Sequence, residues 1–173
     1  MSRLPRTELL LALACAVAAA MLAASQFTDM FHLIPPGGEA LEARTSEDQH
    51  GYAMLVLAVL SLVLLAVALS AKPGVDGLGV RKVASFGVAA AGVVALLLFL
   101  TIDLPDVNKI GTLDDERRSF IDAKAEPQAG FWLELIGSMV LAACGVGLAT
   151  MRQPVDSSDG SAEGPQRPYA YQR

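Results

Sequence analysis

The chain is poor in the residues that usually carry chemistry. It contains two cysteines, two histidines and one tryptophan among 173 residues. Cys15 and Cys144 both lie inside apolar runs, so we expect no disulfide framework. The sequence also has no P-loop, nucleophile-elbow, HExxH or CxxC pattern, which leaves phosphoryl transfer, standard hydrolase chemistry and zinc catalysis without support. We therefore expect a protein that is not an enzyme and that carries no cofactor.

Basic residues are also scarce. The 13 Lys and Arg residues are outnumbered by 18 Asp and Glu residues, and the formal net charge is −5. Phosphate binding requires a basic surface, so this balance argues against a nucleic-acid partner.

Apolar residues are abundant instead, at 53% of the chain, and they gather in four long runs. The runs cover residues 9–27, 52–71, 83–102 and 131–150. Each run has about 19–20 residues, enough for a helix to cross the ~30 Å hydrocarbon core of a bilayer. Only a helix satisfies its own backbone over that length in lipid, and the runs have almost no polar face. We predict an all-α membrane protein of four transmembrane helices in a left-handed bundle, with a membrane domain over residues 1–152.

The distribution of charge between the runs predicts the orientation. Basic residues precede the first run (Arg3, Arg6), lie in the short second connection (Lys72, Arg81, Lys82) and follow the fourth run (Arg152). The other two connections, residues 28–51 and 103–130, hold twelve carboxylates. The positive-inside rule then places both termini in the cytoplasm and these acidic loops outside the plasma (inner) membrane. Residues 153–173 are rich in Pro, Gly, Ser and Asp and are expected to be a disordered cytoplasmic tail.

The first run has an alternative interpretation. Arg3 and Arg6, followed by an apolar stretch and small residues, are also typical of a secretory signal peptide. Cleavage would leave three spans with an outside N-terminus and the remaining topology unchanged.

The two halves of the chain resemble each other, and each consists of a span, an acidic loop and a second span. The second spans open with the similar segments 49–52 and 128–131, so two repeated hairpins related by a pseudo-twofold axis are expected. Small residues recur every fourth position and should form helix-packing or self-association faces. They are Ala12, Ala16, Ala20 and Ala24 in the first run and Gly87, Ala91 and Ala95 in the third. Aromatic residues at the outer ends of the spans (Phe27, Phe31, Tyr52, Phe131 and Trp132) indicate a membrane interface.

Local signals in the two loops favour short helices. Residues 39–47 fit one helix, and the capping box of residues 112–115 predicts a second that runs to about Ala125, before Pro127. Together the two loops would form a small extracytoplasmic cap.

The candidate functional residues are His32, His50, Asp103 and Glu134. Imidazole with the nearby Asp29, Glu47 and Asp48 could bind a divalent transition metal. A spacing of seventeen residues between the histidines is no recognised ligand pattern, so we expect no metal site and treat both histidines as solvated or capping residues.

Glu134 is the most unusual polar residue, because it is a carboxylate that lies about one turn into the apolar fourth span. It could accept a proton or pair with a cation of the cap, such as Lys109 or Arg117. We favour a carboxylate that reaches interfacial water near a helix N-terminus.

The plan of Ala/Val/Leu-rich spans, acidic outer loops and the segment 130–133 entering the last span resembles the uncharacterised four-span integral membrane proteins of high-GC bacteria. That group implies no activity. The topology is also similar to that of claudin-like tetraspans, but residues 28–49 contain neither Trp nor Cys, so we reject that assignment. The hypothesis is an accessory or envelope-associated interaction protein that contacts a protein partner or itself. The alternative is a small oligomeric transporter or channel with Glu134 and Asp103 in an outer vestibule.

Overall fold

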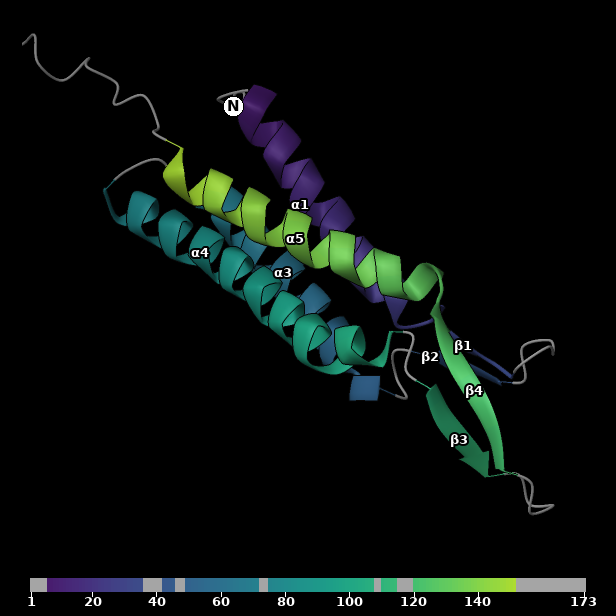
Figure 1. Cartoon of the computed structure of the whole chain (residues 1–173). Coiled ribbons are helices and arrows are strands. Elements are labelled where there is room, and N and C mark those ends of the chain that lie inside the picture. Colours follow the sequence, from purple (N-terminus) through teal and green to yellow (C-terminus); the bar gives the residue numbers. More distant parts are fainter. Residues whose placement is uncertain are drawn as a thin grey trace, which may run out of the picture.

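Four long helices dominate the computed structural model, which describes residues 6–35, 42–45, 49–71, 75–107, 110–114 and 120–151. They are α1 (Arg6–Ser25), α3 (Ala53–Ser70), α4 (Val75–Leu98) and α5 (Ala129–Thr150) (Figure 1). After α4 the chain continues helically through a π turn (Phe99–Asp103) and a 3₁₀ turn (Leu104–Asp106). All four helices are long and apolar enough to cross a membrane, as the expected runs predicted.

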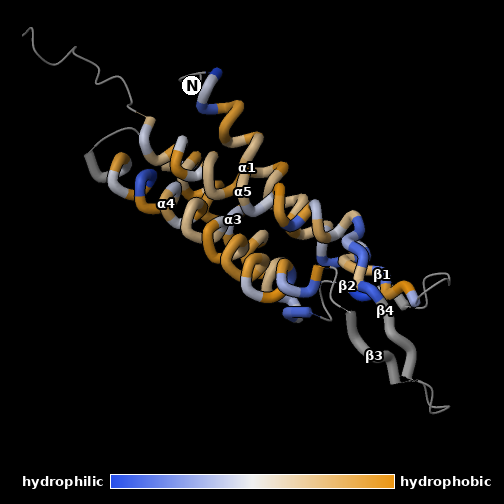
Figure 2. Tube along the Cα trace, in the orientation of Figure 1, coloured by the Kyte–Doolittle hydropathy of each residue, from blue (hydrophilic) through white to orange (hydrophobic). Residues whose placement is uncertain are grey.

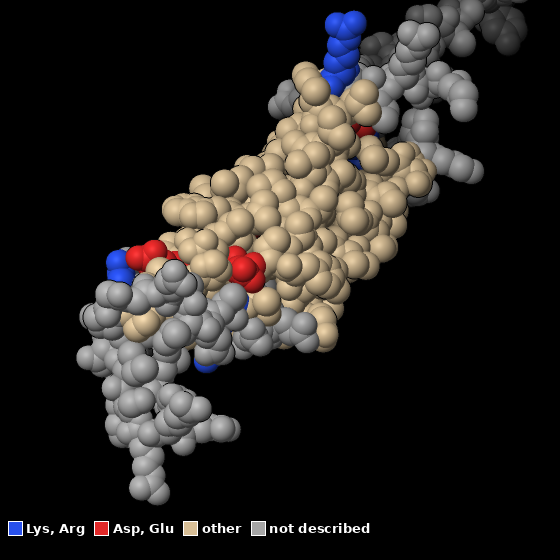
Figure 3. Space-filling view, turned by 90° about the vertical axis from the view of Figure 1, so that its right-hand side faces the viewer, with Lys and Arg blue, Asp and Glu red and all other residues tan. Residues whose placement is uncertain are grey.

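Each helix packs mainly against two others. Helices α1 and α4 both contact α3 on one side and α5 on the other. The beginning of α1 and the end of α5 lie at one end of the helices, and the strands that follow α1 and precede α5 gather at the other end (Figure 1). Apolar residues cover the helices along their length, and the face shown in Figure 3 is almost free of charged atoms between the two ends (Figures 2 and 3).

The two long loops form one antiparallel sheet. Its strands are β1 (Asp29–Ile34), β2 (Glu42–Thr45), β3 (Ile110–Asp114) and β4 (Phe120–Pro127), in the order β2-β1-β4-β3. β1 is the link, because Phe31 lies opposite both Arg44 of β2 and Pro127 of β4. We call this end of the molecule the sheet end, and the end where α1 begins and α5 ends the terminal end.

The sheet corrects two predictions from the loop sequences. The helix expected within residues 39–47 is wrong, since residues 42–45 form β2. The helix expected from residue 113 to Ala125 is also wrong, because that segment contributes to β3 and β4. The capping box was a local signal, and pairing with β1 outweighed it. Residues 121–126 in fact alternate apolar and polar side chains (Ile, Asp, Ala, Lys, Ala, Glu), the period-two pattern of a strand.

The strand order does not follow the expected repeat. If the loops were two copies of one hairpin about a twofold axis, the first strands of the two loops, β1 and β3, would occupy equivalent positions in the sheet, and so would the second strands, β2 and β4. The inner strands are instead β1 and β4, the first strand of one loop and the second strand of the other.

A small aromatic core fixes the sheet to the helices. The Phe131 ring of α5 lies 5.7 Å from that of Phe31 in β1 and 4.7 Å from that of Phe99 at the end of α4. All three side chains are buried, together with Met30 and Ala125. Burial of such side chains contributes about 1.5–3 kcal/mol each, so the sheet is held against the helix ends.

Glycines allow α4 and α5 to approach closely. A Cβ atom on Gly92 would come within 2.4 Å of the backbone nitrogen of Ala142, and one on Gly145 within 2.5 Å of that of Ala89. The predicted small-residue faces only partly coincide with this packing. Ala91 and Ala95 are buried, but Ala20 and Ala24 of the first stripe are exposed on α1. Ala12 of that stripe is buried, and the face that α1 buries continues through Cys15, Ala18 and Leu22.

Candidate functional site

Three ionisable side chains meet inside the protein at the sheet end. The Nε2 atom of His50 lies 3.1 Å from Oε1 of Glu134 and 3.6 Å from Oδ2 of Asp103. The His50 side chain is 3% exposed, and both carboxylates are fully buried. We call these three residues the buried triad. His50 precedes α3, Asp103 ends the π turn after α4, and Glu134 lies in α5, so the triad joins three helices.

A glycine turn places His50. The residue after it, Gly51, has a φ of +59°, a left-handed conformation that glycine adopts far more readily than other residues. The buried amide of Gln26, just beyond α1, donates a hydrogen bond of 3.0 Å from Nε2 to the Gly51 carbonyl oxygen. This contact ties the turn before α3 to the end of α1 and fixes the backbone from which the imidazole projects.

Asp103 is placed by a change of helix type. It ends the π turn that follows α4, where the Leu104 N–H bonds to the carbonyl oxygen of Phe99. One turn of π-helix rotates the following side chains relative to a regular α-helix, and such turns often occur at functional sites. Neither Asp103 oxygen accepts a hydrogen bond of 3.5 Å or less from the residues that the structure describes.

Glu134 is placed by α5, one turn beyond the buried Phe131 ring. Its carboxylate lies against His50 and is fully buried, which corrects the prediction of a carboxylate that reaches water. The alternative partners, Lys109 and Arg117, lie outside the described side chains. The carboxylate is instead paired with an imidazole that is 84 residues away in the sequence.

The triad controls the charge of its histidine. Burial by itself would lower the pKa of His50, but the adjacent carboxylates of Asp103 and Glu134 favour the charged imidazole, outweigh burial and raise the pKa to about 9. The imidazole is therefore protonated at neutral pH when nothing else occupies the site. One imidazolium then faces two carboxylates, which leaves an excess of negative charge if both are ionised.

Three of the four candidate residues thus lie together, and His32 does not join them. His32 is on β1, where its Nε2 atom lies 3.2 Å from Oδ2 of Asp29. Both side chains are substantially exposed and border an open hollow of about 360 Å³ with Thr28 and Gln128. Of the two histidines considered as ligands, only His50 belongs to a group of three or more metal-ligating side chains among the described residues. Glu47 and Asp48 lie outside those residues.

A second buried charge pair was not foreseen from the sequence. At the terminal end, Nη2 of Arg81 on α4 lies 2.6 Å from Oε1 of Glu8 on α1, with side chains 11% and 3% exposed. The sequence pattern indicates Arg81 only as a basic residue near the end of a span. The useful signal was Glu8 itself, an acidic residue at the start of an otherwise apolar run.

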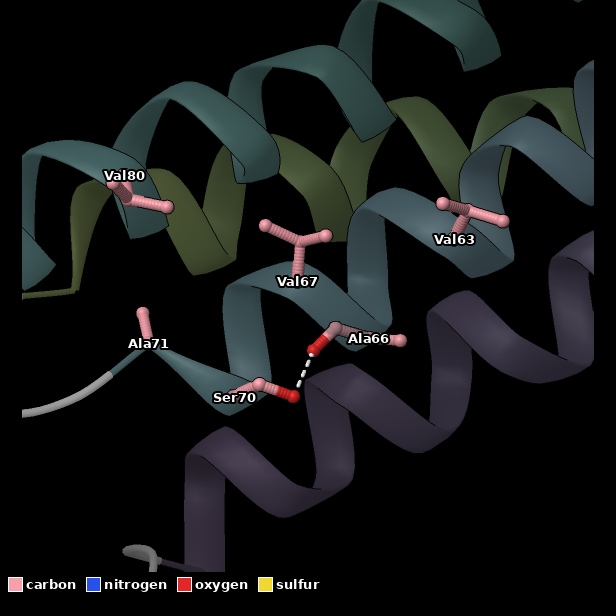
Figure 4. Close-up of a pocket in the computed structure, with 6 residues that line it drawn as sticks. All are labelled: Val63, Ala66, Val67, Ser70, Ala71 and Val80. Atoms are coloured by element: carbon pink, nitrogen blue, oxygen red, sulfur yellow. Dashed lines mark hydrogen bonds between the residues drawn. The ribbon is translucent and has the colours of Figure 1, made fainter.

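The apolar hollows offer less chemistry. The side chains of Val63, Ala66, Val67, Ser70 and Ala71 from α3 and its C-cap line a shallow hollow of about 480 Å³ with Val80 of α4 (Figure 4). The hydroxyl of Ser70 donates a hydrogen bond of 2.7 Å to the Ala66 carbonyl oxygen within the same helix. The free thiols of Cys15 and Cys144 lie close enough to interact between α1 and α5.

Comparison with protein-family models, with curated proteins and with solved structures gives no match for this chain. The resemblance to four-span bacterial proteins therefore stays a prediction from the sequence, and any function must be argued from the geometry itself.

Proposed function

We propose that this chain is a non-enzymatic integral membrane protein of the plasma membrane whose extracytoplasmic sheet contacts a protein partner. Both termini lie in the cytoplasm in this proposal, and the sheet forms the expected cap. The four helices form a left-handed bundle.

The observation that carries the proposal is the joining of two loops into one sheet. Loops that only connect helices do not need to pair with each other across more than 80 residues of sequence. Here β1 and β4 pair, and an aromatic core fixes the sheet to the helix ends. The edge strands β2 and β3 carry backbone groups that a further extended segment can pair with, which is a common mode of peptide recognition. The sheet thus supplies a platform, attached to the helices, with edge strands suited to a partner.

Exposed aromatic side chains support the proposed position in the membrane. Phe27, Tyr52 and Trp132 are 73%, 55% and 52% exposed, and all three flank the point where the helices give way to the sheet. Aromatic rings are enriched at the level of lipid headgroups, so the sheet would stand just outside that level. The packing of α1 against α3 and α5 supports a retained first span rather than a cleaved signal peptide.

The spacing of buried residues supports a left-handed bundle. Along α3, the buried side chains are Met54, Ala58, Ser61, Leu65 and Ala68, at alternating intervals of four and three residues. A repeat of 3.5 residues is the pattern of left-handed helix packing.

The alternative is a small oligomeric transporter or channel, and the burial of Asp103 and Glu134 in one place favours it. Ions crossing the membrane need polar groups along the whole path. Away from the two ends, the buried polar side chains of the described helices are serines, and Ser61 and Ser138 donate to carbonyl oxygens of their own helices. The interaction protein is therefore the better-supported proposal.

Site-specific photo-cross-linking in native membranes tests the proposal. A photoreactive residue would replace Arg44, which is exposed on β2, and in separate variants Lys82 or Val59, which are exposed on α4 and α3. We expect position 44 to give a discrete adduct with one protein that has an extracytoplasmic domain, identified by mass spectrometry, and positions 59 and 82 to lack it. An adduct of the same protein at position 82 alone, or none at position 44, would contradict the proposal.

The orientation is tested separately in intact cells. In a background in which Ala replaces Cys15 and Cys144, single cysteines at positions 44 and 82 would be exposed to a membrane-impermeant thiol reagent. We expect labelling at 44 in intact cells and at 82 only after lysis. The reverse pattern would invert the topology.

A further inference from the structure

The geometry points to a binding site for one divalent first-row transition-metal ion, such as Zn²⁺ or Mn²⁺, formed by His50, Asp103 and Glu134. The site lies inside the sheet end and does not depend on the proposed partner surface.

The spacing of the potential ligand atoms fits one small cation. One nitrogen and two carboxylate oxygens, one from each residue, all lie within 4.8 Å of one another. The imidazole Nε2 lies 3.1 Å from one carboxylate oxygen and 3.6 Å from the other. In a tetrahedral zinc site with ligands at about 2.1 Å, neighbouring ligand atoms are separated by about 3.4 Å. Small side-chain adjustments would therefore give three ligands, and water would complete the coordination.

The state of Asp103 is the independent observation that points to a ligand. Its carboxylate is fully buried at 0% exposure, and neither oxygen has a hydrogen-bond partner among the described residues. Buried carboxylates without hydrogen bonds are rare, because loss of hydration must be compensated. Both the second carboxylate of the site and the imidazole lie beside Asp103, so a cation placed between them would satisfy it.

The charges select the class of cation. Two carboxylates and one neutral imidazole neutralise a divalent ion, which matters because an excess charge is costly in a buried site. A mixed set of one nitrogen and two oxygens suits borderline ions of the first transition row. Ca²⁺ and Mg²⁺ prefer sites built only from oxygen, and the absence of a thiolate in the group argues against Cu⁺.

Such an ion would connect the parts of the chain that carry the sheet. His50 lies between β2 and α3, Asp103 lies between α4 and β3, and Glu134 follows β4 in α5. The ion would therefore fix three helix ends and the strands attached to them. The alternative to a metal ion is a site that holds only protons, one on the imidazole, which is then charged, and one shared by the two carboxylates.

The test is metal binding to the full-length, tag-free protein in detergent, after chelator treatment and dialysis. Zn²⁺ and Mn²⁺ would be titrated by calorimetry, Co²⁺ would be followed by its visible spectrum, and Ca²⁺ and Mg²⁺ would serve as controls. We expect one Zn²⁺ per chain, a rise in Tm on binding, and a Co²⁺ spectrum of nitrogen and oxygen ligation without a thiolate charge-transfer band. Asp103→Asn and Glu134→Gln should each weaken Zn²⁺ binding by more than about 100-fold, beyond the 10–100-fold typical of residues that only orient ligands.

Control variants distinguish metal binding at this site from binding at other side chains, and loss of binding from loss of folding. His32→Ala, which removes the exposed histidine, and the double variant Cys15→Ala/Cys144→Ala should leave affinity and stoichiometry unchanged. Thermal unfolding of each variant without metal shows whether it still folds. If Asp103→Asn does not fold, Glu134→Gln and the Co²⁺ spectrum of the unaltered protein decide the matter. The inference is overturned if no transition metal binds at millimolar concentration, if the thiolate band appears, or if folded Asp103→Asn and Glu134→Gln bind like the unaltered protein.

Discussion

The buried charged residues at the two ends of the helices are paired in different ways. At the terminal end, Glu8 and Arg81 form a one-to-one pair, in which each charge is met by its opposite. At the sheet end, His50 is shared between Asp103 and Glu134. The two charges of such a pair cancel, and the pair links α1 to α4, which both pack mainly against α3 and α5. The buried triad has two carboxylates for one imidazole, and such an excess of buried negative charge costs free energy unless a further proton or a cation neutralises it. The sheet end is therefore the better candidate for a functional site.

At both ends of the helices, a charged residue is buried although its position in the sequence predicts exposure to water. The sequence pattern places Arg81 in the short basic connection that the positive-inside rule uses, yet the residue lies in α4 and is almost buried and paired. Glu134, expected to reach water, is fully buried. The charge of a residue near a span end is therefore no guide to its exposure, since a partner on a neighbouring helix can hold it inside.

The largest effect is expected from breaking the terminal pair. Arg81→Leu leaves the buried Glu8 carboxylate without a counter-charge and should lower the free energy of unfolding by roughly 3–5 kcal/mol. Thermal or denaturant unfolding in detergent would measure the loss. The double variant Glu8→Leu/Arg81→Leu removes both charges and should recover most of it, while Lys82→Leu, at an exposed neighbouring position, should change little. Equal losses in the single and double variants would show that the pairing itself is unimportant.

The second effect concerns pH at the sheet end of the metal-free protein. The folded-state pKa of His50 is raised from 6.5 to about 9, so its stabilising contribution is fully present below pH 6.5 and is lost as pH rises toward 9. The loss should be on the order of 3 kcal/mol, from the difference between the two pKa values.

Unfolding measured from pH 6 to pH 9.5 with a chelator present would reveal this slope. His50→Gln should remove it, whereas His32→Gln, at the exposed histidine, should keep it. A slope that survives in His50→Gln would assign the pH dependence to another group.

A smaller effect tests how the triad is held. Gly51→Ala places a Cβ in open space but at a φ of +59°, so only the backbone is strained. We expect a loss of about 1 kcal/mol in unfolding free energy. Gly79→Ala is the matched control, because its Cβ also meets no atom within 4 Å but its backbone is helical, and it should stabilise the protein slightly. Equal effects from the two alanines would show that the left-handed turn is not required.

The smallest effect is expected at the exposed pair on β1. Asp29→Asn removes the carboxylate beside His32, but the two side chains are 50% and 32% exposed. Surface pairs of this kind contribute little because water screens them. The change in unfolding free energy should stay below about 0.5 kcal/mol, measured beside Asp103→Asn in the same buffer. A loss above 1 kcal/mol would show that exposure does not distinguish this pair from the buried triad.

Part of the candidate site could be predicted from the sequence. Glu134 and Asp103 are candidates because carboxylates in or beside an apolar run are unusual, and His50 is a candidate because the chain has only two histidines. Their meeting could not be predicted. It depends on a π turn before Asp103, on the left-handed turn at Gly51 and on the packing of α4 against α5 through Gly92 and Gly145, and none of these follows from hydrophobic periodicity.

The amino-acid sequence by itself determined the four apolar helices. Their length and composition leave no other way to satisfy the backbone in an apolar environment, and this constraint acts within each segment. Only the tertiary structure decided that the two loops pair as one sheet and that residues 50, 103 and 134 share one buried site. Strand pairing and charge burial depend on contacts between segments far apart in the chain, and local signals such as a capping box lose to them when the long-range contacts bury more surface.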